Sequence, residues 1–250
     1  MTSIAIPTIK TLYPLALAEG EGVGTAYEYV AKRLVLRPWL NKQPTPKHIL
    51  LAGLPQKYGS SLDFFLLAHE LGAQLTIAET DPALLAKAER ALKNIQQKGQ
   101  WRTLRPRWQL LNSWSDLGGQ QFEVAFCSEV LQRLPQAERP SYVQAIQQVV
   151  GRWALFCPNA DNAAHLNLSG LGGVGLAEVQ ALFPQCPAHY IDMPPFPPGI
   201  TRTDSQREQA TSGTAEAIAM WGLGYYARAE KWLPTAVRRR YAHIVYALWG

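Results

Sequence analysis

Short apolar runs alternate with amphipathic segments through the middle of the chain. Segments 62–71 and 140–150 repeat apolar residues at helical spacing, and Asp81-Pro82 is a typical start for a helix that runs to about Lys98. Strands that alternate with helices of this length predict βαβ units and a doubly wound, mostly parallel sheet. Five of the apolar runs have the length of buried strands: 48–54, 74–79, 107–111, 122–127 and 153–157.

The two ends of the chain depart from this alternation. Residues 19–40 carry a helical pattern, and we predict an N-terminal helical preface, or cap, over 1–46. The core is predicted over 47–193 and 236–250, with a cap insertion at 194–235 between them. In this later part we expect a helix at 176–183, a strand at 188–192, a stiff proline-rich loop at 193–199 and an aromatic-rich helix at 214–232. Residues 241–249 favour a closing strand, although their pattern also fits a helix.

Composition narrows the class of protein. Of the 250 residues, 47% are hydrophobic and 17% are charged, which is enough to bury a substantial core. The formal charge of +5 is too small to indicate a nucleic-acid partner. Three cysteines and five histidines stand apart, so neither a disulfide framework nor a metal site is predicted. No apolar run has the length of a transmembrane helix, and residues 1–10 lack the pattern of a signal peptide; we expect a soluble, cytoplasmic protein.

Candidate chemistry follows the ends of the predicted strands, where doubly wound sheets bind ligands. The turn 53–61 after the first strand carries glycines that would let a ligand approach the backbone, and the next helix offers free N–H groups. A plain strand-to-helix turn is the alternative. Glu79 ends the second strand, 20 residues beyond Gly59, where a carboxylate suits ribose hydroxyls. A solvated glutamate is the alternative there.

The third and fourth strand ends also carry polar residues. Asn112, Ser113 and Trp114 could hydrogen-bond and cover an adenine, or could form a capping turn with a packed tryptophan. Ser128 and Glu129 would lie at the mouth of the ligand crevice, or would simply begin a helix.

In their order and spacing, these segments resemble the small-molecule type of class I S-adenosylmethionine-dependent methyltransferases, which have a Rossmann-like fold. The resemblance covers about residues 45–195; Phe122–Leu134 is similar to the family's fourth-strand segment, and Cys157-Pro-Asn159 with His165 is similar to its "PN…H" pattern. It implies a seven-stranded sheet with an antiparallel last strand, S-adenosylmethionine as cofactor and methyl transfer to a small molecule. The first motif departs from the family, because Ala52 stands near its acidic position and 54–58 replace the glycine run. That departure motivates an alternative, a catalytically degenerate binding or scaffold protein, unless Asp63 or a preface residue replaces the acid.

The resemblance also implies roles for individual residues. His165 is the predicted general base and Glu129 the second candidate, although His165 could instead lie in a surface loop or cap a turn. Acceptor contacts are predicted for Tyr27, Asn159 and Tyr225. The predicted cofactor contacts are Gly53, Leu54, Tyr58, Gly59, Ser60, Glu79, Thr80, Asn112, Ser113, Trp114 and Ser128.

Three further patterns leave alternatives open. The aromatic residues of 220–232 could line an apolar pocket or pack a helix on the sheet. The triplet Arg238–Arg240 could attract a phosphate-bearing headgroup or a membrane surface, or form a solvated face. A nucleotide-sugar or dinucleotide enzyme would also fit the glycine turn with Glu79.

Overall fold

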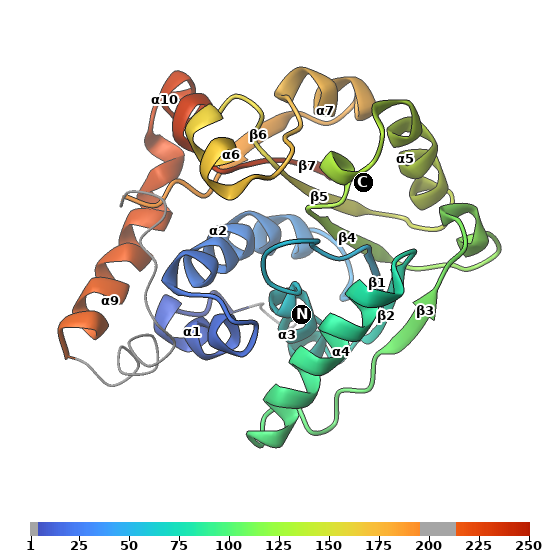
Figure 1. The fold of residues 1–250 in the computed structure, drawn as a ribbon, viewed down its shortest axis with the longest axis horizontal. Helices are drawn as coiled ribbons and strands as arrows, with labels where there is room; N and C mark the ends of the chain where they lie inside the picture. The colour runs from blue at the N-terminus through green and yellow to red at the C-terminus, as the bar shows by residue number, and fades with distance from the viewer. Residues whose placement is uncertain (1–4, 196–213) are drawn as a thin grey trace.

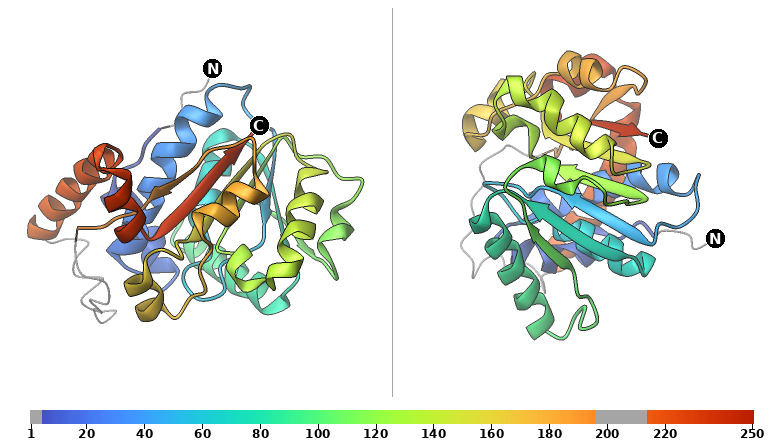
Figure 2. Two further views of the ribbon diagram at one scale, coloured as in Figure 1. Left: turned by 90° about the horizontal axis from the view of Figure 1, so that it is seen from above. Right: turned by 90° about the vertical axis from the view of Figure 1, so that its right-hand side faces the viewer.

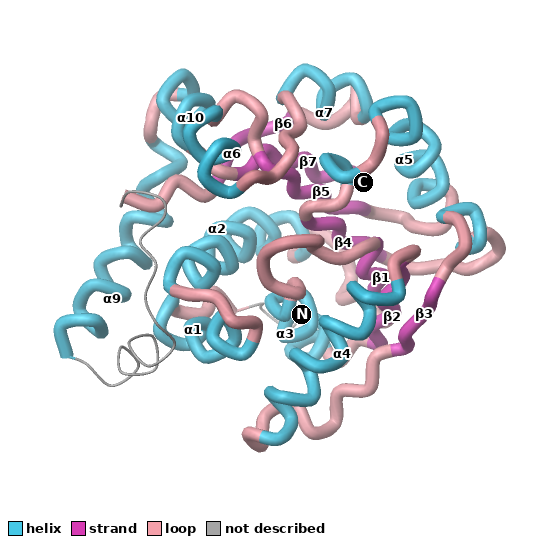
Figure 3. The backbone as a smooth tube through the Cα atoms, viewed as in Figure 1, coloured by secondary structure: helices cyan, strands magenta, loops and turns pink. Residues whose placement is uncertain are grey.

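A single seven-stranded sheet runs through the molecule, with helices on both faces (Figures 1 and 3). The computed structural model describes residues 5–195 and 214–250. The strand order is β3-β2-β1-β4-β5-β7-β6; β7 is antiparallel to both neighbours and the other pairings are parallel. The strands are β1 (His48–Ala52), β2 (Gln74–Glu79), β3 (Arg107–Leu110), β4 (Val124–Ser128), β5 (Trp153–Pro158), β6 (Ala188–Ile191) and β7 (Ile244–Trp249).

The helices divide between the two faces of the sheet (Figure 2). One face is covered by α1 (Ile9–Ala18), α2 (Val23–Leu40), α3 (Leu62–Leu71), α4 (Pro82–Gln97) and α9 (Thr214–Ala229). The other face is covered by α5 (Arg139–Gln147) and α7 (Leu176–Leu182). Two short helices, α6 (Ala163–Ser169) and α10 (Thr235–Tyr241), follow β5 and precede β7. Short 3-10 turns complete the connections: η1 (Trp114–Leu117), η2 (Leu131–Arg133), η3 (Gln136–Glu138) and η4 (Glu230–Trp232).

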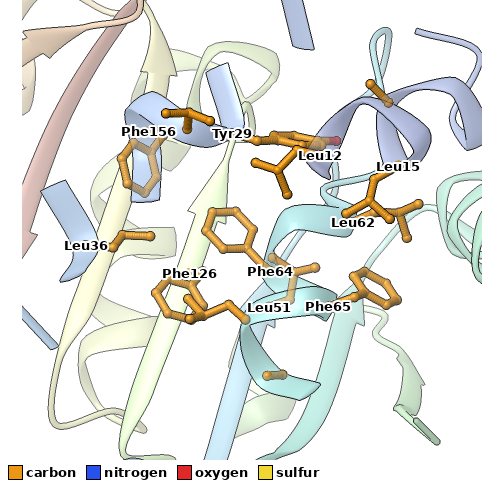
Figure 4. Close-up of a cluster of buried hydrophobic side chains, with 14 of the residues drawn as sticks. Leu12, Leu15, Tyr29, Leu36, Leu51, Leu62, Phe64, Phe65, Phe126 and Phe156 are labelled. Atoms are coloured by element: carbon orange, nitrogen blue, oxygen red, sulfur yellow. The ribbon is translucent and has the colours of Figure 1, made fainter. Parts of the chain in front are cut away.

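Apolar side chains point alternately to the two faces of the sheet, so both faces are buried. Along β1, Ile49 and Leu51 point to the α2 side while Leu50 and Ala52 point to the α5 side. On the α2 side the ring of Phe64 stacks on that of Phe126, with centroids 4.7 Å apart, below Leu12 and Tyr29 from the N-terminal helices (Figure 4). A sheet buried on both faces needs continuously apolar strands, and this is the pattern that the sequence shows.

The predicted alternation of strands and helices is confirmed, as are the closing strand and its antiparallel direction. The predicted helix at 214–232 is present as α9 followed by η4. Three helices were not predicted: α1, which contains Pro14, and the short α6 and α10. Of the predicted proline-rich loop, 196–199 lie outside the described residues.

The predicted preface and cap insertion pack against each other on one face of the sheet. Helix α9 lies along α1 and α2. The Tyr27 hydroxyl donates a 2.7 Å hydrogen bond to Glu230 Oε2, which also accepts from the Met193 backbone N–H at 3.0 Å. Glu230 begins η4 directly after α9, so these buried bonds hold the C-terminal end of α9 in place. The division into core and caps stays a prediction.

Candidate functional site

The carboxyl ends of β1, β2 and β4 meet at the point where the strand order reverses. From β1 the strand order runs to β2 and β3 on one side and to β4 and β5 on the other, so the order reverses between β1 and β4. Doubly wound sheets bind ligands at such a point. Gly53 has φ +92°, and a Cβ built there would lie 2.6 Å from Val130 Cγ2. The turns after β1 and β4 are therefore in direct contact, and only glycine fits between them.

Glu79, the predicted ribose contact, is fully buried. Its Oε1 accepts the backbone N–H groups of Thr80 at 2.7 Å and Asp81 at 3.1 Å, and the Thr80 hydroxyl also lies 3.3 Å away. Its Oε2 accepts the Leu54 N–H at 2.9 Å and Arg133 Nη2 at 2.5 Å. Both oxygens thus have two strong donors, so a ribose could reach this carboxylate only if Arg133 moved away.

The turn between β1 and α3 is closed by carboxylates of the N-terminal segment. Glu19 Oε1 accepts the Ser60 N–H at 2.8 Å and the Leu62 N–H at 2.9 Å, and Glu21 Oε1 accepts the Gly59 N–H at 3.2 Å. The Leu62 N–H is the first free donor of α3, and the other two belong to the turn before it; all three would otherwise be available to an anionic ligand. Burial raises the pKa of Glu19 to about 7, against hydrogen bonds such as that from the Tyr29 hydroxyl, which lower it.

A buried lysine forms the centre of the site between α2 and β4. Lys32 is 2% exposed; it pairs with Glu28 and donates to Ser128 Oγ at 2.8 Å. Burial alone would lower its pKa, but the charges of Glu28 and Asp63 outweigh burial and hold the pKa above its usual value. Lys32 is therefore a fixed cation beside the end of β4.

Two buried carboxyl groups face this lysine without being fully satisfied. Burial raises the pKa of Asp63 to about 6 against the opposing charge of Lys32. Burial and the charge of Glu28 raise the pKa of Glu129 to about 8, although Lys32 acts in the opposite direction. We call Glu19, Glu28, Asp63 and Glu129 the carboxylate cluster. Its four carboxyl groups outnumber the cations that act on them, which are Lys32, Arg33 beside Asp63 and Lys87 near Glu129, and this favours a cationic ligand.

Buried polar atoms without a partner gather at the same place. Of the ten buried side-chain atoms without a hydrogen-bond partner among the described residues, six belong to this place: Ser60 Oγ, Ser61 Oγ, Asp63 Oδ1, Glu129 Oε2, Gln132 Oε1 and Arg133 Nε. The backbones of Ser61 and Glu129 are left-handed, with φ +60° and +57°, a conformation that costs a non-glycine residue about 1–3 kcal/mol. Unsatisfied groups and strained backbone in one place are typical of a ligand site.

The residues after β3 form a cap at the rim of the site. Ser113 caps η1 in a capping box with Asp116, whose Oδ2 accepts the N–H groups of Asn112 at 2.9 Å and Ser113 at 3.1 Å. Trp114 is half-buried, and its ring contacts the edge of Tyr142 at a centroid distance of 4.7 Å. The structural alternative therefore holds for this segment, and its contact with an adenine stays a prediction.

His165 lies apart from these groups, on α6 after β5. Its ring stacks on His243 at 4.0 Å, and His243 Nδ1 lies 3.1 Å from Asp192 Oδ2. Burial and the neighbouring His243 lower the pKa of His165 to about 4. His165 lies on a short helix and not in a surface loop, which was the alternative for this residue, and its role as the general base stays a prediction.

The three predicted acceptor residues are not brought together. Tyr27 is fully buried and bonded to Glu230. Asn159 is fully buried, and its Nδ2 donates to the carbonyls of Arg239 at 2.8 Å and Ala242 at 2.9 Å. Tyr225 lies on the outer face of α9 and is exposed. The structure thus gives Tyr27 and Asn159 bonds that hold the fold, and their contact with an acceptor stays a prediction.

Several residues of this site were missed in the sequence. Arg133 belongs to the segment 122–134 that carries the family resemblance, yet no role was predicted for it. Lys32 and Glu28 form an i,i+4 pair within an otherwise apolar face, which is a detectable signal. The position of Glu19 could not be read from spacing, because it depends on how α1 and α2 pack over α3.

Two further observations limit the chemistry. Within 5–195 and 214–250, no group of three or more His, Cys, Asp or Glu side chains is placed to hold a metal ion. In the same ranges, no helix combines the length and the apolar character needed to cross a membrane. A shallow recess lined by His48, Gln74, Arg107 and Phe122 lies at the amino ends of the strands, away from the candidate site.

Comparisons with known proteins find similar solved structures but no similar sequence. No protein-family model matches the sequence, and no curated protein matches it significantly. Among solved structures, magnesium protoporphyrin IX methyltransferase from Synechocystis with bound S-adenosylhomocysteine gives a TM-score of 0.48 at 12% identity, over 91% of this chain and 83% of that one. A putative sarcosine dimethylglycine methyltransferase from Galdieria sulphuraria gives 0.48 at 11% identity, over 93% and 88%. TehB from Haemophilus influenzae gives 0.47 at 10% identity, over 85% of this chain and only 59% of that one.

The strand order and the antiparallel β7 of this chain themselves define the Rossmann-like, seven-stranded sheet that the sequence resemblance implies. Identities of 10–12% at these TM-scores assign no activity to the chain. Function has to come from the site itself.

Proposed function

We propose that the carboxyl edge of β1, β2 and β4 binds S-adenosylmethionine and that the protein transfers its methyl group to a small-molecule acceptor. The observation that carries this proposal is the carboxylate cluster at the switch point, with unpartnered oxygens on Asp63 and Glu129. A ligand with a sulfonium and an ammonium group would neutralise charges that Lys32 alone does not balance.

The residues present fit such a cofactor in distinct ways. Asp63 and Glu129 would accept from or lie beside its positive groups, and Ser60 and Ser61 would offer their buried hydroxyls. Glu79 would take the ribose after Arg133 leaves it. The cofactor supplies a methyl group already activated on a sulfonium, so alignment and exclusion of water are the main tasks left to the protein.

Glu129 is the better of the two candidate bases. Its raised pKa of about 8 lies close to neutral pH, where a group can both take and release a proton, and its Oε2 has no partner among the described residues. The pKa of about 4 of His165 makes it a weak base, and its ring is held against His243. We therefore assign removal of an acceptor proton, where the acceptor must lose one, to Glu129.

The same geometry argues against a dinucleotide or nucleotide-sugar ligand. Such ligands place their phosphates on the N–H groups that begin the first helix after β1. Here Glu19 holds the first of these donors, the Leu62 N–H, and Glu19 and Glu21 hold the Ser60 and Gly59 N–H groups of the turn before it. A pyrophosphate would also meet the negative charge of the carboxylate cluster.

A second candidate function is a binding or scaffold protein that keeps the fold without the activity. The specific observation in its favour is Glu79, whose two oxygens are bonded entirely within the chain. In that case Arg133 is a permanent replacement for the ribose.

Calorimetric titration with S-adenosylmethionine and S-adenosylhomocysteine tests the proposal. We expect micromolar binding by the wild-type protein and about 10–100-fold weaker binding by Glu79→Ala, since a hydrogen bond to a charged group contributes about 1.5–3 kcal/mol. Glu89→Ala, an exposed glutamate of α4 paired with Lys93, is the matched control and should bind normally. No binding by folded wild-type protein would reject the cofactor. Binding without turnover of labelled cofactor in a cell extract would favour the scaffold.

A further inference from the structure

An exposed stripe of large apolar side chains runs along the outside of α9 and η4. Ile218, Trp221, Tyr225 and Trp232 follow one another at spacings of three, four and seven, so they share one side of the helical segment. Their exposed fractions are 65%, 66%, 58% and 75%, and the rings of Trp221 and Tyr225 lie 4.5 Å apart. We call these four residues the aromatic face.

The opposite side of the same segment is firmly attached to the protein. Met220 and Ala227 are buried, the Tyr226 ring lies 6.4 Å from that of Tyr27, and Glu230 is held by Tyr27. The aromatic face is therefore not a core surface that could turn inward. It is presented outward by a helix packed on α1 and α2 (Figure 1).

Cations lie at the C-terminal end of the aromatic face and on α10, which follows it. Lys231 is exposed and lies 5.3 Å above the Trp232 ring, and Arg240 on α10 lies 5.5 Å above the Tyr241 ring. Arg239 also is exposed, paired with Asp161 at 2.9 Å, while Arg238 donates to backbone carbonyls. Glu230 is the only carboxylate in 228–241, and it is buried.

We propose that the aromatic face, with Lys231 beside it and the cation Arg240 on the following helix α10, docks the protein on an anionic lipid bilayer. Tryptophan and tyrosine favour the boundary between headgroups and acyl chains, and lysine and arginine above them pair with lipid phosphates. The convex outside of a helix fits a planar surface rather than a small-molecule ligand, which needs a concave site. Positive charge selects an anionic partner, and large exposed indole rings require an apolar phase that a soluble polyanion lacks.

Flotation with phospholipid vesicles tests the docking surface directly, without reference to cofactor or activity. Wild-type protein should float with vesicles of phosphatidylcholine containing phosphatidylserine, and much less with phosphatidylcholine alone. Trp221→Ser/Trp232→Ser should reduce partitioning by about 100-fold or more, because two indole rings no longer leave water. Lys231→Gln/Arg240→Gln should reduce it by about fivefold for each removed cation, and added salt should mimic that loss.

Matched controls and two opposing outcomes make the test decisive. Lys98→Gln/Leu110→Ser removes an exposed cation just after α4 and an exposed leucine of β3, and it should float like the wild type. All substitutions are at exposed positions, so thermal melts should be unchanged within error. Failure of the wild type to float, or normal flotation of Trp221→Ser/Trp232→Ser, would overturn the proposal. A wild-type dimer in sedimentation that the same variant converts to a monomer would assign the face to a second copy of the chain instead.

Discussion

Replacing Arg133 by alanine distinguishes a site that binds the cofactor from one that Arg133 closes permanently. Arg133 Nη2 lies 2.5 Å from Glu79 Oε2 and is the single side-chain cation on a carboxylate that otherwise accepts from Thr80, Leu54 and Asp81. If Glu79 holds the ribose, the cofactor and Arg133 compete for the same oxygen. Arg133→Ala should therefore strengthen binding of S-adenosylhomocysteine.

The size of the effect follows from the bond that is removed. A hydrogen bond between charged groups contributes about 1.5–3 kcal/mol, and each 1.4 kcal/mol is tenfold in affinity, so the gain should be about 10–100-fold. Folding should suffer less than the 3–5 kcal/mol typical of a broken buried pair, because Glu79 keeps three backbone donors. We expect a loss of about 1–3 kcal/mol in the free energy of unfolding.

Calorimetry on three proteins measures this prediction. Arg139→Ala is the matched control, since Arg139 is 12% exposed against 13% for Arg133 and pairs with Glu178 at 2.7 Å outside the site. It should lose similar stability and leave the affinity for S-adenosylhomocysteine unchanged. Affinity that is unchanged or weaker in folded Arg133→Ala would refute the competition, and an equal gain in Arg139→Ala would show that the gain is not local.

Three other perturbations have worked-out directions. The pKa of Glu19 is raised from 4.5 to about 7, so its stabilising contribution is complete below pH 4.5 and is lost as the pH rises through 7. In urea unfolding experiments, the free energy of unfolding of the wild type should fall on the order of 3 kcal/mol over that window, and Glu19→Gln should lack this fall. Gly53→Ala should destabilise by about 2–4 kcal/mol, because it combines overpacking with a positive φ, whereas Gly72→Ala has open space and should lose only the strain component. Tyr27→Phe should cost about 1.5–3 kcal/mol in unfolding experiments through the lost bond to Glu230; a normal stability with an altered acceptor KM would restore its predicted role as an acceptor contact.

The fold could be predicted because its signals are local and repeated. Each buried strand is a short apolar run, and Asp81-Pro82 caps its helix as expected, with Asp81 accepting the Ala83 N–H. Helix α1 was missed because Pro14 lies inside it, where a proline usually ends a helix. Helices α6 and α10 lack three large apolar residues at helical spacing, which Leu176, Val179 and Leu182 provide in the equally short α7.

The position of the site could be predicted from the sequence, but the partners of its residues could not. Strand ends place Gly53, Glu79 and Ser128 at one edge of the sheet, and topology alone brings them together. The partners of these residues come from elsewhere: Lys32 from a helix that crosses the sheet, and Arg133 from a short turn. Long-range packing decides such contacts, and no spacing in the sequence records it.

The ion pair between Arg133 and Glu79 explains how a charged site can stay closed in the free protein. Glu79 without Arg133 would leave a fully buried carboxylate with backbone donors alone, and a buried arginine without it would lack a counter-ion. When ribose hydroxyls replace Arg133, Glu79 exchanges one charged hydrogen bond for others, and the guanidinium returns to water. The apparent affinity is then the intrinsic affinity multiplied by the fraction of molecules in which Arg133 has moved. The pair therefore stabilises the fold and weakens the ligand through the same bond, which is why Arg133→Ala should lower stability and raise affinity together. A purely structural pair would lower stability alone.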